Sequence, residues 1–401
     1  MRASLPVCIV GAAMLAALPA VLPAGLLIAS IQMLIAALFA SAYGLLGGRA
    51  GMLSFGHAAY FGTGVFATVH AMNAFGGTGL LPTPLLPLVG AGAGLAMGIV
   101  AGWFATQRGG VAFAMITLAI AELLHALAPQ LKGLFGGESG ISAMRAPAWG
   151  LTFGSTTQVY YLTLVWVLVS LGLLYFHSLT PAGRLTLALR ENGHRLRFLG
   201  YNAHGLAVSA FAISAMFSGV AGALQALSNE AANYAVFDAG VSATVVLNSY
   251  IGGVGSFLGP ALGAAMMTFF GYAVSDATQS WLLYQGILFV LVMMYAPSGV
   301  SGLIGTGVRL VRQRGWRVPV LSLGAALLLC AGATFVIEML QRLCSQDYRA
   351  LARMASAWPP VALFGHPWPP TALFTWALPA GLLAGGTWLA LSARRRLGTP
   401  A

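Results

Sequence analysis

Apolar segments of about 20 residues follow one another along nearly the whole chain, separated by short stretches that contain Gly, Pro and Arg. A helix needs about 20 apolar residues to cross the hydrocarbon core of a bilayer. The pattern therefore predicts an all-α fold, a polytopic helical membrane bundle. We expect spans near residues 5–22, 26–46, 51–72, 85–105, 111–129, 157–178, 205–228, 281–304, 318–339 and 372–392.

Two regions of the predicted bundle are rich in helix-breaking residues. The apolar stretch 241–272 contains "IGGVGSFLGP", which a single helix would not tolerate, so we expect two short or re-entrant segments that meet at residues 252–260. Glycines also crowd the segment 51–64. We therefore predict broken or re-entrant helices near 51–64 and 241–272.

Composition supports this fold class. Of the 401 residues, 59% are hydrophobic and 7% are charged, against about 25% charged in soluble proteins, which excludes an ordinary soluble enzyme or binding domain. The net charge of +11 is gathered in short arginine clusters between apolar runs. Nucleic-acid binding would need a continuous basic face, so we expect no nucleic-acid partner.

The arginine clusters also predict an orientation. If residues 179–204 and both termini face the cytoplasm, 14 of the 19 basic residues lie on that side, as the positive-inside rule requires. The loop 341–371 departs from the rule, because Arg342, Arg349 and Arg353 fall outside. The first apolar segment is read as an uncleaved span, and a cleaved signal peptide is the alternative.

The sequence lacks the motifs for ATP binding, metal binding and hydrolysis. The single lysine, Lys132, follows Leu131, so the chain has no Walker A motif, and any ATP must be bound by another subunit. No spacing typical of a metal site or a hydrolase is present, and we predict no catalytic residue, metal or cofactor. Glu122 and His125 lie three residues apart within a span. They could relay protons, contact a polar solute or satisfy each other.

Three stretches carry a resemblance to a known family. They are "GGRAGMLSFGHAAYFGTGVFA" (47–67), "GRLTLALRENGHRLRFLGYNAHGLAVSAFAISAMFSGVAGAL" (183–224) and "LNSYIGGVGSFLGPALGAAM" (247–266), the last followed by "YAPSGVSGLI" (295–304). Together they resemble the LivM-type inner-membrane permease of branched-chain amino-acid ABC importers. The resemblance covers about residues 25–305.

The resemblance implies partners and a location. Such a permease lies in the bacterial inner membrane and pairs with a second homologous permease subunit. It works with two cytoplasmic ATPase subunits and a periplasmic substrate-binding protein that delivers the amino acid. We expect residues 1–305 to form the permease domain, with a coupling loop at 179–204. Residues 306–401 would be a C-terminal extension with two further spans.

The resemblance also implies site residues. The basic segment between two spans would couple the bundle to the ATPase, or would be only a solvated positive-inside loop; its residues are Arg184, Arg190, Glu191, Asn192, Arg195, Arg197, Gly200, Tyr201 and Asn202. A second set would line the translocation pathway or gate, or would serve tight packing alone. It comprises Gly51, Ser54, Gly56, His57, Tyr60, Gly62, Gly252, Gly253, Gly255, Gly259 and Pro260.

The sequence thus favours a permease subunit that moves branched-chain or related amino acids by alternating access. An importer of urea or short amides is the alternative within the class. From another class comes a proton-coupled secondary carrier that uses Glu122 and His125. A membrane scaffold without transport explains the broken segments poorly.

Overall fold

The computed structural model describes residues 4–76, 80–275, 278, 280–296, 298–303, 305–306, 316–355, 358–364 and 366–397. The chain folds into two compact units, Met1–Ala273 with Leu288–Ser301, and Val274–Ile287 with Gly302–Ala401. Among the described residues, seven helices are long and apolar enough to cross a membrane. The predicted fold class, a polytopic helical bundle, is confirmed.

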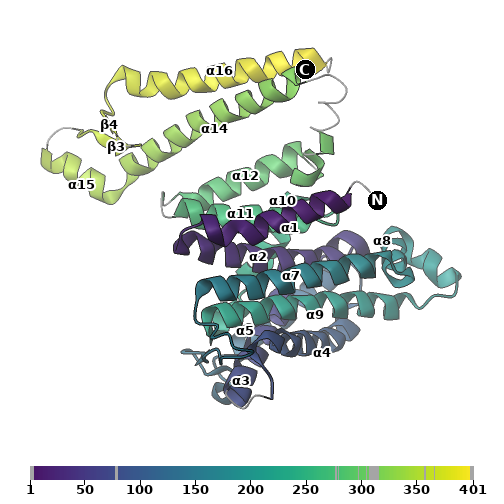
Figure 1. The fold of residues 1–401 in the computed structure, drawn as a ribbon. Coiled ribbons are helices and arrows are strands. Elements are labelled where there is room, and N and C mark those ends of the chain that lie inside the picture. The colour runs from purple at the N-terminus through teal and green to yellow at the C-terminus, as the bar shows by residue number, and fades with distance from the viewer. Residues whose placement is uncertain are drawn as a thin grey trace. The chain divides into compact units, whose positions relative to one another are not determined.

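The first unit contains most of the helices (Figure 1). Its elements are α1 (Ser4–Val21), α2 (Ala24–Gly44), the π-helix η1 (Leu45–Ala50), α3 (His57–Phe75), the 3-10 helix η2 (Thr83–Leu85), α4 (Pro87–Ala105), α5 (Gly110–Leu127), α6 (Lys132–Phe135), β1 (Ile141–Ser142), α7 (Thr156–Leu179), α8 (Pro181–Phe198), α9 (Ala203–Asn229), β2 (Ala231–Ala232), the 3-10 helix η3 (Tyr234–Phe237), α10 (Ala239–Gly252) and α11 (Gly259–Ser275). The strands β1 and β2 pair antiparallel, with Ile141 opposite Ala232.

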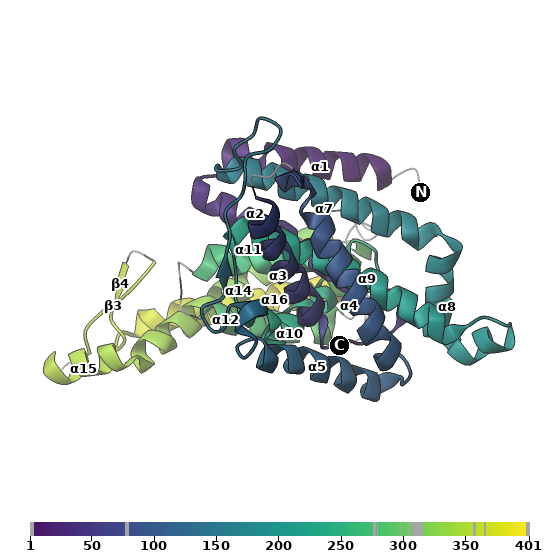
Figure 2. The same ribbon diagram turned by 90° about the horizontal axis from the view of Figure 1, so that it is seen from below.

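The 27-residue helix α9 forms the centre of this unit. It packs against α2, α3 and α4, and Figure 2 shows these helices around it. Gly90, Gly94, Gly98 and Gly102 recur every four residues in α4 and face α9. A Cβ atom on Gly94 would come within 2.5 Å of the Ala215 carbonyl oxygen. The glycines therefore let the two helix backbones touch, which is how small residues drive helix association in membranes.

The helix boundaries differ from the predicted spans in two places. The span predicted at 51–72 begins at His57, because residues 51–56 are not helical and Gly51 has a left-handed φ of 70°. The span predicted at 281–304 is interrupted, since α12 (Trp281–Tyr295) ends at Tyr295 and a turn donates the Gly299 N–H to the Ala296 carbonyl oxygen. Gly299 has a φ of 68°, which favours glycine.

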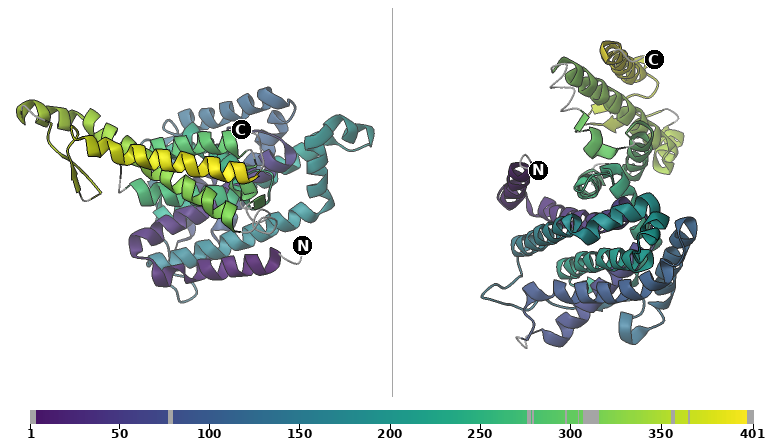
Figure 3. Two further views of the ribbon diagram at one scale, coloured as in Figure 1. Left: turned by 90° about the horizontal axis from the view of Figure 1, so that it is seen from above. Right: turned by 90° about the vertical axis from the view of Figure 1, so that its right-hand side faces the viewer.

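The second unit is built on a helical hairpin. The helices α14 (Arg317–Cys344) and α16 (Leu373–Leu397) pack side by side (Figure 3). Their connection holds α15 (Gln346–Ala355) and the antiparallel strands β3 (Val361–Leu363) and β4 (His366–Trp368). Four of the basic residues expected on the cytoplasmic side, Arg2, Arg309, Arg312 and Arg314, lie outside the described residues.

Candidate functional site

The predicted coupling segment forms the helix α8, which extends beyond the ends of α7 and α9 (Figure 2). Thr180 caps its start by accepting a hydrogen bond from the Gly183 N–H, and Pro181 occupies the first turn, a position that suits proline. Asn192 has non-helical angles (φ −162°, ψ 93°), so α8 is two short helices that meet at a kink. The Asn192 side chain accepts a hydrogen bond from the Arg195 N–H and caps the second one.

The residues after α8 occupy the positions that end this helix and begin α9. Gly200 has a φ of 83°; its N–H bonds to the Arg197 carbonyl, and the Tyr201 N–H bonds to that of Leu196. This is the Schellman arrangement, which places glycine just after a helix. Asn202 then caps α9 through the Gly205 N–H at 2.9 Å. The segment is thus a capped helix between two spans, and Arg184, Glu191, Arg195 and Arg197 are exposed on its surface.

Arg190 joins α8 to the π-helix η1. Its Nη1 donates a hydrogen bond of 2.5 Å to the Gly48 carbonyl oxygen. A Cβ atom on Gly51 would lie 2.7 Å from the Arg190 Cγ, so the arginine stem lies directly against the end of η1. Arg49, on the same turn, donates to the Ser178 carbonyl oxygen at the end of α7. Arg190 therefore fixes η1 to α8, and Arg49 fixes it to the end of α7.

The broken helix pair lies on the other side of η1. A Cβ atom on Gly48 would come within 2.4 Å of the Val254 carbonyl oxygen, and one on Gly44 within 2.7 Å of the Pro260 ring. Within the break, a Cβ atom on Gly252 would overlap the Gly259 carbonyl oxygen at 1.9 Å. The glycines are thus backbone contacts that allow α10, α11 and η1 to meet.

A cavity of about 160 Å³ lies where these elements converge. Its polar lining comes from Ser41, Arg49, Ser178, Arg190 and Ser256, and residues 254–257 of the break contribute to its wall. The structure therefore brings one predicted coupling residue, Arg190, together with the predicted gate residues Gly255 and Pro260. The other predicted coupling residues do not line this cavity; Asn192 and Asn202 cap helices, and Arg184, Glu191, Arg195, Arg197 and Tyr201 are exposed.

The predicted pathway residues Ser54, His57 and Tyr60 are fully buried. His57 Nε2 lies 2.8 Å from the Ser214 hydroxyl, which donates its own proton to the Ala42 carbonyl oxygen. Since the single hydroxyl proton of Ser214 is used, Nε2 must carry the proton that it shares with Ser214. Nδ1 lies 3.0 Å from the Ser54 hydroxyl and, in the neutral ring, accepts a hydrogen bond from it. His57 therefore ties the non-helical segment 51–56 to α9 and, through Ser214, to α2.

Neighbouring groups complete this cluster. The Ala58 N–H donates to the Ser242 hydroxyl of α10, and the Phe55 N–H donates to Thr117 of α5. The hydroxyls of Tyr43 and Tyr60, whose rings lie edge-on to His57, are buried and have no hydrogen-bond partner among the described residues. A buried unpaired hydroxyl costs about 1–3 kcal/mol, so these two groups are not explained by stability.

Glu122 and His125 lie in different environments. The Glu122 side chain is exposed on α5, and no hydrogen bond or ion pair joins it to a described residue. The His125 ring is partly buried and lies beside Tyr234 of η3, with a ring-centroid distance of 5.5 Å. The two side chains do not satisfy each other in this conformation.

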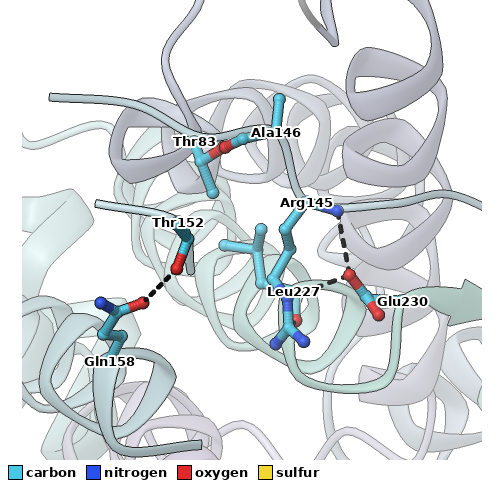
Figure 4. Close-up of polar contacts among 7 residues, drawn as sticks. All are labelled: Thr83, Arg145, Ala146, Thr152, Gln158, Leu227 and Glu230. Carbon is cyan, nitrogen blue, oxygen red and sulfur yellow. Dashed lines mark hydrogen bonds and ion pairs between the residues drawn. The ribbon is translucent and has the colours of Figure 1, made fainter. Parts of the chain in front are cut away.

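At the opposite end of α7, the loop 128–155 is held by a contact that sequence reasoning did not single out (Figure 4). Arg145 Nε lies 3.0 Å from Glu230 Oε1, which also accepts from the Arg145 backbone N–H at 2.9 Å. Arg145 Nη1 donates to the Leu227 carbonyl oxygen, and Thr83 donates to that of Ala146. The loop is therefore fixed to the ends of α9 and η2, while Met144 and Trp149 remain 86% and 69% exposed.

Comparisons with known proteins agree with these features. The family described as the permease component of branched-chain amino acid transport systems matches residues 25–297. The high-affinity branched-chain amino acid transport system permease protein LivM of Salmonella typhimurium is 28% identical over 278 residues, covering 63% of this chain and 64% of that protein. LivM of Escherichia coli is also 28% identical, over 277 residues with the same coverage. BraD of Pseudomonas aeruginosa is 25% identical over 296 residues, covering 69% of this chain and 94% of that protein.

The chain thus matches less than two thirds of the length of the two LivM proteins. No solved structure matches it. The family match runs from α2 to the end of α12 and covers most of the first unit, without α1. The chain belongs to the family of permease components of branched-chain amino acid transport systems, as its motifs predicted.

Proposed function

We propose that this chain is the membrane-spanning subunit of an ATP-driven importer that receives branched-chain or related amino acids from a binding protein. The proposal rests chiefly on one observation, the hydrogen bond between Arg190 of α8 and Gly48 of η1. Through it, a helix outside the spans is linked directly to the broken part of the bundle. The names of the relatives supply the solute class.

The proposed mechanism is alternating access driven through α8. The exposed residues Glu191, Arg195 and Arg197 would dock on a cytoplasmic ATPase subunit, so the end of the unit that carries α8 faces the cytoplasm. Closure of the two ATPases on ATP would displace α8 and, through Arg190, η1. Since Gly48 lies against Val254, movement of η1 would reposition the α10–α11 break and open or close the pathway.

The proposed pathway passes close to His57. The unpaired hydroxyls of Tyr43 and Tyr60 are the buried polar groups there that the fold leaves unused. When the segment 51–56 moves, these hydroxyls and the freed backbone groups would meet the charged ends of a zwitterionic amino acid, as the broken helices of other transporters do.

The second permease subunit is proposed to cover the exposed face of α5. Ala112, Met115, Ala119, Glu122 and Ala126 form a stripe along that face. Glu122 lies about 5 Å along the helix axis from the midpoint of α5. A carboxylate at that depth would cost a few kcal/mol against lipid, and such groups almost always face protein or water. The loop 128–155, at the end opposite to α8, would receive the binding protein.

The test is to purify the full chain in mild detergent with its co-expressed partners and to identify the bound subunits by mass spectrometry. We expect two ATPase subunits and a second, similar permease, and ATP-dependent amino acid uptake after reconstitution with the binding protein. Glu191→Ala should abolish this uptake, whereas Asp347→Ala, an exposed carboxylate outside the family match, should leave it unchanged.

Recovery of an active chain without partners would overturn the proposal and favour the proton-coupled carrier. In that case Glu122→Gln, and not Glu191→Ala, would stop uptake. Transport of urea or short amides by the complete complex, with no amino acid uptake, would retain the importer but contradict the proposed solute class.

A further inference from the structure

The connection between α14 and α16 lies outside the family match, which ends at residue 297. α14 stops at Cys344 because Ser345 is extended (φ −64°, ψ 146°). The Ser345 hydroxyl then accepts a hydrogen bond from the Tyr348 N–H and starts α15. The chain therefore leaves a membrane-spanning helix and immediately forms a second, short helix with its own cap.

The two faces of α15 differ in chemistry. At 100° per residue, Tyr348, Leu351, Ala352 and Ala355 fall on one arc of the helix, while Arg349 and Arg353 fall on the opposite one with Gln346. This is the amphipathic pattern of helices that lie in the plane of a membrane surface. Leu351, the one leucine on the apolar arc, is 58% exposed.

Packing fixes the orientation of α15. The Tyr348 hydroxyl donates to the Pro359 carbonyl oxygen at 2.7 Å. The hairpin of β3 and β4 buries Val361 and Leu363 against Met339 of α14, and Tyr348 packs against the same cluster. The apolar arc of α15 is thus held at the end of the α14–α16 pair, where the spans end (Figure 3).

Large aromatic side chains are exposed at this end of the α14–α16 pair. Trp358 is 56%, Phe364 68% and Phe374 57% exposed. Tryptophan is enriched where membrane-spanning elements meet the lipid headgroups. Exposed rings beside two spanning helices therefore favour a lipid boundary over bulk water.

Three arginines lie in and beside this connection. Arg342, Arg349 and Arg353 are exposed, and none forms an ion pair or a side-chain hydrogen bond with a described residue. Asp347 is the one acidic residue in the segment 340–371. The connection therefore has a surplus of positive charge beside its exposed apolar side chains, which is complementary to an anionic lipid surface.

We propose that α15 and the β3–β4 hairpin lie on the membrane surface, with Leu351 at the acyl boundary and the three arginines bound to the phosphates of anionic phospholipids. This role also gives a reason for three arginines in a loop that the positive-inside rule would place outside. The proposal does not depend on the solute or on the partner subunits, because it concerns only the second unit.

The test uses the full chain in nanodiscs, with its cysteines replaced by serine and a spin label at Leu351→Cys. We expect the label to be several-fold more accessible to oxygen, which dissolves in lipid, than to a water-soluble nickel chelate. The matched control is Ala350→Cys, an exposed position one residue away on the polar side, which should show the reverse preference. Equal accessibility at the two positions, or a water-exposed label at 351, would overturn the proposal.

The lipid headgroup is tested in the same labelled protein. Phosphatidylglycerol added to phosphatidylcholine nanodiscs should deepen the label at 351, and the double variant Arg349→Gln, Arg353→Gln should remove that lipid dependence. High salt should weaken it as well. A label that is equally deep in both lipids, with or without the arginines, would contradict the binding of anionic lipid.

Discussion

The guanidinium of Arg190 donates a hydrogen bond to the carbonyl oxygen of Gly48, which lies 142 residues earlier in the chain. The donor belongs to a helix outside the spans, and the acceptor belongs to a π-helical turn inside one. The bond therefore joins an exposed helix to the segment where the bundle departs from α-helical geometry.

Replacement of Arg190 by alanine should uncouple transport from ATP hydrolysis. The side chain is exposed, so the fold and the assembly should survive, while displacement of α8 would no longer reach η1. We expect uptake by the reconstituted complex to fall about tenfold or more, a barrier change of about 1.4 kcal/mol, with hydrolysis largely retained. Arg108→Ala, an exposed arginine between α4 and α5 that belongs to neither predicted site, is the control and should behave as wild type. Equal losses of hydrolysis and uptake would contradict the coupling role.

Gly252→Ala should destabilise the first unit. Its Cβ atom would lie 1.9 Å from the Gly259 carbonyl oxygen, so α10 and α11 would have to separate. Overpacking of this kind typically costs about 1–3 kcal/mol, which thermal unfolding in detergent would detect. In the same loop, Gly255→Ala meets no atom within 4 Å and should unfold like wild type. A stable Gly252→Ala protein would show that the two helices are not tightly joined.

The bond between His57 and Ser214 can be tested by removing the hydroxyl. Ser214→Ala leaves the buried Nε2–H of His57 without an acceptor, which should cost about 1–3 kcal/mol. Ser209→Ala, on the exposed side of the same helix, should cost much less. Nitrogen-15 spectra of labelled histidine should report an Nε2-protonated neutral ring in wild type. A ring protonated on Nδ1 would refute the assigned tautomer.

Arg145→Ala should loosen the loop 128–155 without disturbing the spans. The substitution removes the ion pair to Glu230 and the bond to the Leu227 carbonyl. Since Glu230 is partly exposed, we expect a local loss of about 1 kcal/mol and amide hydrogen exchange several-fold faster in residues 141–148. Lys132→Ala, an exposed basic residue near the start of the loop, provides the comparison. Unchanged exchange in Arg145→Ala would mean that the backbone pairing of β1 and β2 holds the loop alone.

Hydrophobic pattern was enough to predict most spans and the break at 252–260. Apolar runs of membrane length leave few alternatives to a helix, and glycines next to a proline end one. The same reasoning placed the start of the third span at residue 51. It did not predict the non-helical segment 51–56, because side chains from distant elements hold that segment. The Phe55 N–H donates to Thr117 of α5, and the His57 ring joins Ser54 to Ser214 of α9.

Contacts between distant segments were beyond the local pattern. Glu122 and His125 have the spacing of a helical pair, yet the ring of His125 lies beside Tyr234. The Arg145–Glu230 pair joins residues 85 positions apart, and neither residue lies in a recognisable motif. The chain has only eight acidic residues. Their scarcity was the available signal, because a carboxylate outside the exposed loops needs a partner or a function.

The π-helical turn η1 has a mechanical consequence. A π-turn is an α-helical turn that holds one extra residue, so it can be rewound without breaking the helix. Transfer of that residue out of the turn would rotate everything after it by about 100° relative to α2. Arg49 and Gly51 would then leave α7 and α8, and the Gly48 carbonyl would turn away from Arg190. A change in helical register, as opposed to a tilt of whole helices, would be sufficient to reset this end of the permease.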